Sequence, residues 1–358
     1  MQFIATPFEM TLVPNFSASS ARSAVNQTKM QFSIAFQTNK PLTAYGALAA
    51  QAEAYGFDTV SVYNDLLYQP AWLPLLEIAR ATKRVRIGPA AVNPFTCHPL
   101  NIAGNIALID EASNGRAYLG LTRGAWLDYL GIEPAHPARA MREAIECVRL
   151  LLARSTEPYP GEIFSLAGGD TLRWNILRED IPFLLGAWGQ MTMRACLPYV
   201  SEIKLGGTAN PAIVRRTRAF LDDACLAIGR DPRTIGIVVG AVSLADDDGA
   251  AARLRIKREI ALYLPVIAAL DDTLQIEPER LEQIKTFAAQ YDFESAARLI
   301  SDDLLDKLAF AGTPDQIAAQ VRTLFDAGAS RVEFGTPHGF SEEEGMKLLG
   351  ERVLYALR

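Results

Sequence analysis

The chain has 358 residues, of which 49% are hydrophobic and 21% are charged, and its formal net charge is −6. This composition is typical of a globular protein and excludes disordered, collagen-like and coiled-coil chains. The acidic balance, without a Lys/Arg cluster in the sequence, argues against nucleic acid or an anionic membrane as a partner, because both need a basic face. We therefore expect a small-molecule ligand.

Three further features bound the class of protein. The longest apolar stretch, residues 261–270, is well short of the roughly 18–20 residues that span a bilayer. Residues 1–29 have no apolar signal-peptide core, and we expect them to form a disordered extension ahead of the first strand. The four cysteines are widely spaced and include no Cys-x-x-Cys pair, which fits neither a zinc site nor a disulfide framework. Free thiols, no metal site and a cytoplasmic location are the expectation.

Short aliphatic runs alternate with amphipathic helical patterns from residue 31 to the end of the chain, which is typical of βα units on a parallel sheet. We predict eight strands, over residues 31–37, 58–63, 84–92, 116–122, 181–187, 200–206, 234–242 and 330–336. Helical patterns lie near residues 42–55, 71–81, 99–113, 136–154, 190–199, 211–228 and 314–327, with a closing helix over 341–357. Eight strands that are each followed by a helix predict a single α/β domain, a (β/α)8 TIM barrel over residues 30–358.

Two stretches are too long to be ordinary connections. Residues 246–310, after the seventh strand, are mostly helical and exceed one helix by several turns. We interpret them as an insertion over the barrel mouth, with a small second domain as the alternative. Residues 156–180, rich in Gly and Pro, form a second and smaller insertion.

Barrel enzymes carry their chemistry at the C-terminal ends of the strands, so polar residues there are the first candidates. The second strand ends in Tyr63-Asn64-Asp65, and a carboxylate at this place can bond a heterocycle or orient a proton donor. Its alternative role is to cap the next helix. His338 follows the eighth strand, and His98 follows the third, where it also fits a helix N-terminal packing role.

Two glycine turns follow neighbouring strands. The fifth strand leads into the turn at 186–190 (GAWGQ), and the sixth leads into the turn at 205–208 (LGGT). Backbone N–H groups at such turns can bind a cofactor phosphate, although tight packing explains them equally. The sequence has no Walker motif and no G-x-G-x-x-G after the first strand, so a nucleoside triphosphate or dinucleotide site has little support.

Four segments, in order along residues 31–350, carry a family resemblance. They are residues 87–99 (IGPAAVNPFTCHP), 115–124 (GRAYLGLTRG), 186–190 (GAWGQ) and 312–317 (GTPDQI). These segments resemble the corresponding motifs of luciferase-like flavin and deazaflavin oxidoreductases. The pattern is most similar to the methylene-tetrahydromethanopterin reductases and other coenzyme F420-dependent branches, because Asn64-Asp65 lies where they carry T-D-H.

The resemblance implies a hydride-transfer enzyme that uses coenzyme F420, and commonly a homodimer. FMN is the alternative cofactor, since Arg123-Gly124 resembles a flavin phosphate ligand of the luciferase branch, and an FMN-dependent monooxygenase is the alternative function. The implied cofactor-binding residues are Asn64, Asp65, Ala90, Ala91, Asn93, Arg123, Ala187, Trp188, Gly189, Gln190 and Gly207, with a non-proline cis peptide at Ala90–Ala91. The candidate catalytic residues are Asp65, His338 and Tyr63.

The sequence departs from the family pattern at three places. Leu66, Ala35 and Ala125 stand where relatives carry His, Glu and an acidic residue, so the expected proton donors are missing. A catalytically inactive cofactor-binding barrel is therefore a further alternative. A phosphosugar isomerase or aldolase is weaker, because it needs a strand-end Lys or Glu, whereas Lys204 and Glu333 lie within strands.

Basic residues near the glycine turns bear on the choice of cofactor. F420 carries an anionic lactyl-oligoglutamate tail beyond its phosphate, whereas FMN ends at the phosphate. Arg194, Arg215 and Arg216 lie just beyond the two turns and are the candidate partners of that tail. A solvated helix face is the alternative interpretation of these three residues.

Overall fold

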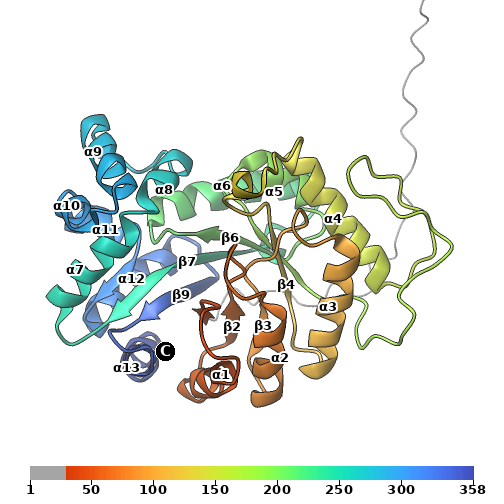
Figure 1. The fold of residues 1–358 in the computed structure, drawn as a ribbon, viewed down its shortest axis with the longest axis horizontal. Coiled ribbons are helices and arrows are strands. Elements are labelled where there is room, and N and C mark those ends of the chain that lie inside the picture. Colours follow the sequence, from red (N-terminus) through yellow and green to blue (C-terminus); the bar gives the residue numbers. More distant parts are fainter. Residues whose placement is uncertain (1–29) are drawn as a thin grey trace, which may run out of the picture.

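The computed structural model describes residues 30–358, so the predicted extension 1–29 lies outside the described residues. Its parallel strands form a barrel surrounded by helices (Figure 1), which confirms the predicted (β/α)8 fold. The strands are β1 (Gln31–Phe36), β2 (Thr59–Val62), β3 (Arg86–Pro89), β4 (Leu119–Thr122), β5 (Phe183–Gly186), β6 (Glu202–Gly206), β7 (Gly236–Ala245), β8 (Phe310–Gly312) and β9 (Arg331–His338). They pair in the order β3-β2-β1-β9-β7-β6-β5-β4. Single bridges, Ile87 to Ala117 and Val92 to Leu121, join β3 to β4 and close the ring.

Helices on the outside of the barrel cover the strands. The barrel helices are α1 (Ala44–Tyr55), α2 (Trp72–Ala81), α3 (Pro99–Ala112), α4 (Pro137–Leu152), α5 (Gln190–Cys196), α6 (Pro211–Ala227), α12 (Pro314–Asp326) and α13 (Glu342–Leu348). Short helical turns are Leu127–Leu130, Pro232–Thr234 and the π-helical Leu349–Leu354, which runs into α14 (Tyr355–Leu357). Between residues 30 and 358, no helix is long and apolar enough to cross a membrane.

The stretch after β7 folds into five helices that pack around a hydrophobic cluster of their own. They are α7 (Gly249–Ile260), α8 (Leu264–Leu270), α9 (Pro278–Ala289), α10 (Phe293–Arg298) and α11 (Asp302–Asp306). Figure 1 shows α8 and α9 at the upper left, on the opposite side of the barrel from α3. The three-residue strand β8 then pairs with the end of β7, outside the barrel order.

Most predicted boundaries differ from the observed ones by a few residues, and three of the differences have a clear structural cause. The third predicted strand, 84–92, is interrupted after Pro89 by a cis peptide bulge. The seventh continues beyond residue 242 to Ala245, because β8 pairs with its end, and β8 itself was too short to predict. The closing helix predicted over 341–357 is divided by the π-helical turn.

Strand alternation sorts side chains between the helices and the barrel interior. In β1, Phe32, Ile34 and Phe36 belong to the main hydrophobic core, whereas Ser33 reaches the interior and bonds Glu333 of β9. A reciprocal capping box starts α12, in which the Thr313 side chain and Gln316 bond each other's backbone N–H groups. The G-T-P-D-Q segment therefore has a direct role in helix initiation.

The lower part of the barrel interior is charged. Arg331 donates from Nε and Nη2 to Glu202 at 3.1 and 3.0 Å, and Arg86 donates to the same carboxylate at 3.3 Å. Burial raises the pKa of Glu202, but the charges of Arg331 and Arg86 lower it by more. The pKa of Glu202 therefore lies below its ordinary value. Glu202 is therefore ionised within the barrel.

The smaller insertion is held against α4 by one buried carboxylate. Glu143 accepts the backbone N–H groups of Glu162, Ile163 and Phe164 at 3.1, 2.7 and 3.0 Å. Nearby, Tyr159 and Leu166 exchange two backbone hydrogen bonds at 2.9 Å. These bonds fix the course of a segment that has little regular structure.

Candidate active site

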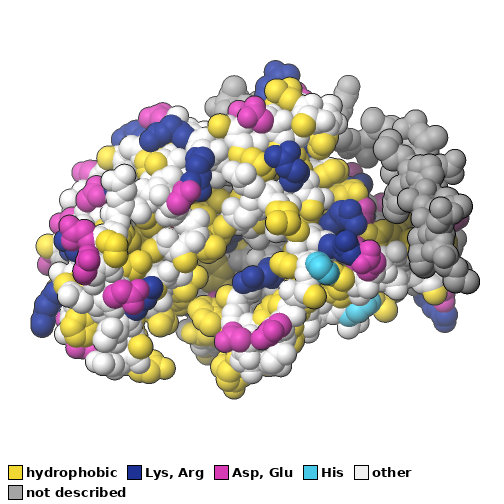
Figure 2. All heavy atoms as spheres, turned by 90° about the horizontal axis from the view of Figure 1, so that it is seen from above, with side chains coloured by type: hydrophobic (Ala, Val, Ile, Leu, Met, Phe, Trp, Pro, Cys, Tyr) yellow, Lys and Arg dark blue, Asp and Glu magenta, His cyan; other side chains and the backbone are white. Residues whose placement is uncertain are grey.

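Small residues line the mouth of the barrel. Near the C-terminal ends of β1, β3, β5, β6 and β9, the inward positions are taken by residues with one or no side-chain carbon, namely Ala35, Ala90, Gly186, Gly206 and Gly335. A Cβ added at Gly206 would have no atom within 4 Å, so open space lies beside that backbone. Figure 2 looks onto this end of the molecule and shows a hollow near the centre, rimmed mainly by hydrophobic side chains.

Asp65 and Asn64 lie at the rim of the hollow, directly after β2. The Asp65 carboxylate accepts a hydrogen bond of 2.8 Å from the Gln37 amide at the end of β1. Asn64 accepts the backbone N–H of Ala71 at 3.0 Å and so fixes the turn into α2. The N-cap residue of α2 is Ala71 and the helix has no side-chain cap, so Asp65 does not have the alternative capping role, and it is exposed at the mouth.

Tyr63 lies deeper and points into the barrel. Its hydroxyl occupies the space where a side chain at Gly335 would begin, and its ring lies 5.2 Å from the Lys204 ammonium. Burial, followed by the charges of Glu333 and Asp65, raises the pKa of Tyr63 well above its ordinary value. The phenol therefore keeps its proton across the physiological pH range.

An aromatic pair forms part of the rim. Trp126, after β4, lies 6.4 Å from Tyr263 at the start of α8, measured between ring centroids. Burial, followed by the Asp65 charge, raises the pKa of Tyr263 above its ordinary value. The large insertion therefore contributes directly to the rim.

The β3 bulge contains the expected non-proline cis peptide at Ala90–Ala91. The Lys204 ammonium lies 3.5 Å from the Ala90 carbonyl oxygen. In the loop that follows, Asn93 accepts the backbone N–H groups of Phe95 and Thr96 at 3.1 and 2.9 Å. Asn93 thus stabilises the loop, and its predicted contact with a cofactor stays a prediction.

The two glycine turns differ in their surroundings. Gly189, like Gly206, would have no atom within 4 Å of an added Cβ, so this turn faces open space. A Cβ at Gly207 would lie 2.7 Å from Ile267 of α8, which covers that residue. Ala187 and Trp188 pack on the main core, and Trp188 also contacts the core of the insertion. The open turn is therefore the better candidate for binding a ligand.

A groove of about 720 Å³ lies beside the Gly189 turn. Its lining comes from the start of α4, the smaller insertion and the start of α5, and includes His136, Arg139, Arg142, Glu162, Gly189 and Thr192. Arg139 forms an ion pair with Glu162 across the groove, and Arg142 lies 3.5 Å from Glu146. Arg123 is exposed directly after β4, and Gln190 is exposed at the first position of α5.

The arginines predicted to meet an anionic tail have other neighbours. The Arg194 guanidinium lies 5.2 Å from the Phe220 ring centroid, and Arg216 forms an ion pair with Asp272 of the insertion. Arg215 is exposed on α6. The arginines that line the groove are Arg139 and Arg142 of α4 instead, and these also have carboxylate neighbours, Glu162 and Glu146.

The two histidines considered from the sequence have clear structural contacts. His338 is fully buried, packs edge-on against Phe36, and has the Phe334 carbonyl at 3.3 Å and Glu342 at 3.5 Å. His98 accepts the backbone N–H of Leu100 at 3.1 Å and caps α3. The catalytic role of His338 stays a prediction. Its charged neighbour, Glu342, belongs to α13.

Two charged residues below the mouth are not among the predicted site residues. Lys204 of β6 and Glu333 of β9 form a buried ion pair, and Ser61 donates to the same carboxylate at 2.5 Å. They were discounted because they lie within strands, yet alternation directs both side chains inward. The pattern of charges at every second position, in E-I-K-L of β6 and R-V-E-F of β9, was the signal available in the sequence.

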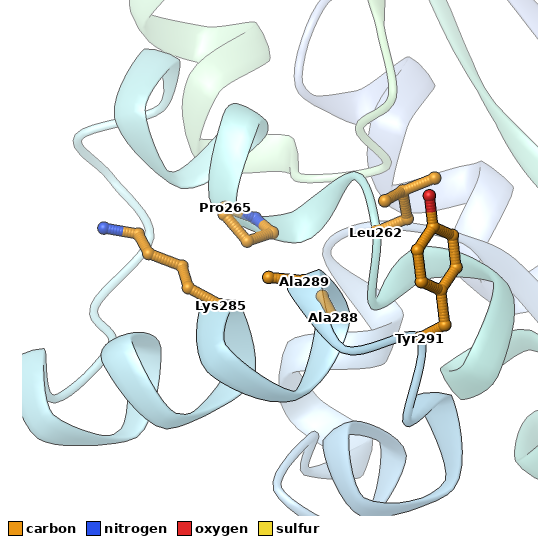
Figure 3. A pocket seen from close by; sticks show the side chains of 6 residues that line it. All are labelled: Leu262, Pro265, Lys285, Ala288, Ala289 and Tyr291. Carbon is orange, nitrogen blue, oxygen red and sulfur yellow. The ribbon is translucent and has the colours of Figure 1, made fainter.

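A second hollow, of about 290 Å³, lies between α8 and α9 (Figure 3). It is lined by Leu262, Pro265, Lys285, Ala288, Ala289 and Tyr291. None of the predicted site residues lines it, and its lining offers a single charged group. We therefore place the candidate site at the barrel mouth.

A family model described as luciferase-like monooxygenase matches residues 18–331. The chain belongs to this family. It is 26% identical over 331 residues to the 5,10-methylenetetrahydromethanopterin reductase of Methanolobus tindarius, covering 91% of this chain and all of the relative. It is also 25% identical over 334 residues to the F420-dependent glucose-6-phosphate dehydrogenase of Amycolatopsis mediterranei, covering 87% of this chain and 93% of the relative.

The fold is shared with solved members of the family. The structure of the coenzyme F420-dependent tetrahydromethanopterin reductase from Methanopyrus kandleri superposes with a TM-score of 0.84 and 24% sequence identity. The match covers 92% of this chain and 99% of that structure. This luciferase-like chain therefore has the same barrel fold as that structure.

Proposed function

We propose that this luciferase-like protein is an oxidoreductase that transfers a hydride between coenzyme F420 and a small organic molecule at the barrel mouth. Two of the proteins named above are F420-dependent according to their names. The small residues at the barrel mouth also leave room for a flat ring. Coenzyme F420 supplies the two-electron hydride chemistry, and the protein supplies the pocket, the orientation and the electrostatics.

The residues at the mouth fit such a cofactor. The bulge at Ala90–Ala91 offers small side chains against which a ring can lie, and Asp65 is held by Gln37 where it can accept a hydrogen bond from the ring edge. The open turn at Gly189 leaves its backbone accessible to a phosphate. No atom lies within 4 Å of a Cβ added at Gly189 or Gly206, and this open space is the structural basis for placing the cofactor here.

The observation that carries the choice of F420 is the groove beside Gly189. An anionic tail beyond the phosphate needs an open path with positive charge, and Arg139 and Arg142 supply that charge along a groove of about 720 Å³. FMN needs only a closed phosphate site. The exposed Arg123 is the one feature that also suits FMN, which makes an FMN-dependent enzyme the second candidate.

Tyr63 is the proton donor that we propose for the substrate. Ala35 lacks the carboxylate of relatives, but Ala35 pairs in register with Gly335, where the Tyr63 hydroxyl lies. A protonated phenol therefore stands next to the position of the missing acid. This arrangement favours an active enzyme over an inactive cofactor-binding barrel.

We expect F420 to bind the apo-protein more tightly than FMN, and its affinity to fall as salt is raised from low to moderate. The paired change Arg139→Gln with Arg142→Gln should weaken F420 about tenfold, because each screened contact is worth about 1 kcal/mol or less. FMN affinity should change less than about threefold by the same reasoning. Fluorescence and absorbance titrations measure both affinities.

The matched control is Arg194→Gln, since Arg194 stacks on Phe220 and does not line the groove. This variant should bind F420 as the parent protein does. If FMN binds at least as tightly as F420, and salt affects neither, the FMN-dependent function replaces the one proposed here.

A further inference from the structure

Lys204 brings four strands together beneath the mouth. It extends from β6 across the barrel, pairs with Glu333 of β9, faces the Tyr63 ring after β2, and has the Ala90 carbonyl of the β3 bulge 3.5 Å from its ammonium. Its side chain is only 8% exposed. Gly240 makes room for it, because a Cβ there would lie 3.1 Å from the Lys204 Cε atom.

Stability alone does not account for this pair. Two ions removed from water carry a large desolvation cost, and hydrophobic residues of similar volume commonly replace such pairs without loss of stability. The Glu333 carboxylate is nevertheless well supported, by Lys204, by Ser61 at 2.5 Å and by Arg331 at 4.0 Å. A supported charge directly below a small-residue hollow points to a role in that hollow.

The connected cluster contains three cations, Arg86, Lys204 and Arg331, and two carboxylates, Glu202 and Glu333. The extra positive charge is that of Arg86, whose side chain is 34% exposed and pairs with Glu202. Arg331 is committed to Glu202 below, so Lys204 is the cation of this cluster that contacts the bulge at the mouth.

We propose that Lys204 is a positioning residue that holds the Ala90 carbonyl in the bulge and makes the floor of the site electropositive. It thereby favours the hydride-loaded form of the bound ring. A hydride that arrives on the ring brings two electrons and one proton, hence one negative charge, and the ammonium below stabilises that charge. The inference rests on the proposed function, because it takes a deazaflavin to be the ring at the mouth.

The test compares affinities for oxidised and reduced F420 in three variants of the full chain. Lys204→Met should lower the preference for the reduced form about tenfold, equivalent to a fall of about 30 mV in the two-electron potential. Glu333→Gln should shift the preference in the opposite direction, because it removes the negative charge that offsets the ammonium. Lys204→Arg should restore most of the parent value.

A purely structural role predicts a different pattern. In that case both single changes would weaken the two forms alike, and the ratio of the two affinities would not move, which would overturn the proposal. If Lys204→Met does not fold, the double change Lys204→Met with Glu333→Gln removes both charges of the pair. It should still lower the preference for the reduced form, by less than tenfold, because the ammonium contacts the bulge at the mouth and the carboxylate does not. A parent protein that binds neither form overturns the proposed function itself, whereas normal binding with unchanged ratios overturns only the role of Lys204.

Discussion

Gly189→Asp should abolish F420 binding, with a loss of at least about 100-fold in affinity. Gly189 has φ −79° and ψ 128°, which any residue adopts, and an added Cβ meets no atom within 4 Å. The substitution therefore leaves the fold intact and places a carboxylate beside the phosphate. Two like charges about 4 Å apart repel by roughly 4 kcal/mol at the effective dielectric constant near a protein surface. Fluorescence titration with F420 measures the loss.

Two comparisons separate charge from bulk. Gly189→Asn adds the same volume without the charge and should retain most of the affinity. Asp65→Asn should weaken binding only a few-fold, because it removes one hydrogen-bond acceptor at the ring edge, worth about 1 kcal/mol. Equal losses for Gly189→Asp and Asp65→Asn would contradict the placement of the phosphate at this turn.

Glu143→Ala should lower the free energy of unfolding by about 3 kcal/mol, since it leaves three backbone N–H groups without their charged acceptor. The melting temperature should fall by about 5 °C for a chain of this size. Thermal unfolding measures both quantities.

The pH dependence of this effect has a definite sign. Burial raises the pKa of Glu143, but the N–H groups of Phe164, Ile163 and Glu162 outweigh burial and bring the pKa below its ordinary value. The stabilisation is therefore complete above the unfolded pKa, about 4.3, and is lost as the pH falls through the lower folded value. Glu157→Gln, an exposed change in the same insertion, is the control and should leave the melting temperature unchanged. A deficit for Glu143→Ala that grows towards acid pH would refute this role of Glu143.

Sequence alone predicted the barrel because its signal is local and repeated. Each barrel strand is a short aliphatic run followed by a helix, and eight such units close in one way. The ends of elements were less certain, since the cis bulge after Pro89 and the pairing of β8 depend on contacts made only in the folded barrel. Tyr63 and Asp65 could be predicted as site residues because they directly follow a strand that the local sequence pattern identifies.

The charged parts of the site were harder to predict. The groove combines Arg139 and Arg142 of α4 with Gly189, about 50 residues later, and nothing in the local sequence indicates that these segments meet. Arg194 was the obvious candidate by sequence distance, but its guanidinium stacks on Phe220. Lys204 could have been recognised from strand alternation, once the inward faces of β6 and β9 were considered together.

Hydride transfer by the parent protein tests the central claim most directly. The protein is loaded with oxidised F420 and mixed rapidly with small organic hydride donors, such as secondary alcohols and reduced pterins, while the visible absorbance of the deazaflavin is followed. The account predicts saturable binding of F420 followed by loss of that absorbance with at least one donor class. In the reverse direction, where the substrate takes up a proton, it predicts a much slower reoxidation of the reduced cofactor in Tyr63→Phe. Binding without reduction by any donor, and without reoxidation of the reduced cofactor by the matching ketones and pterins, would instead identify a cofactor-binding barrel without catalysis.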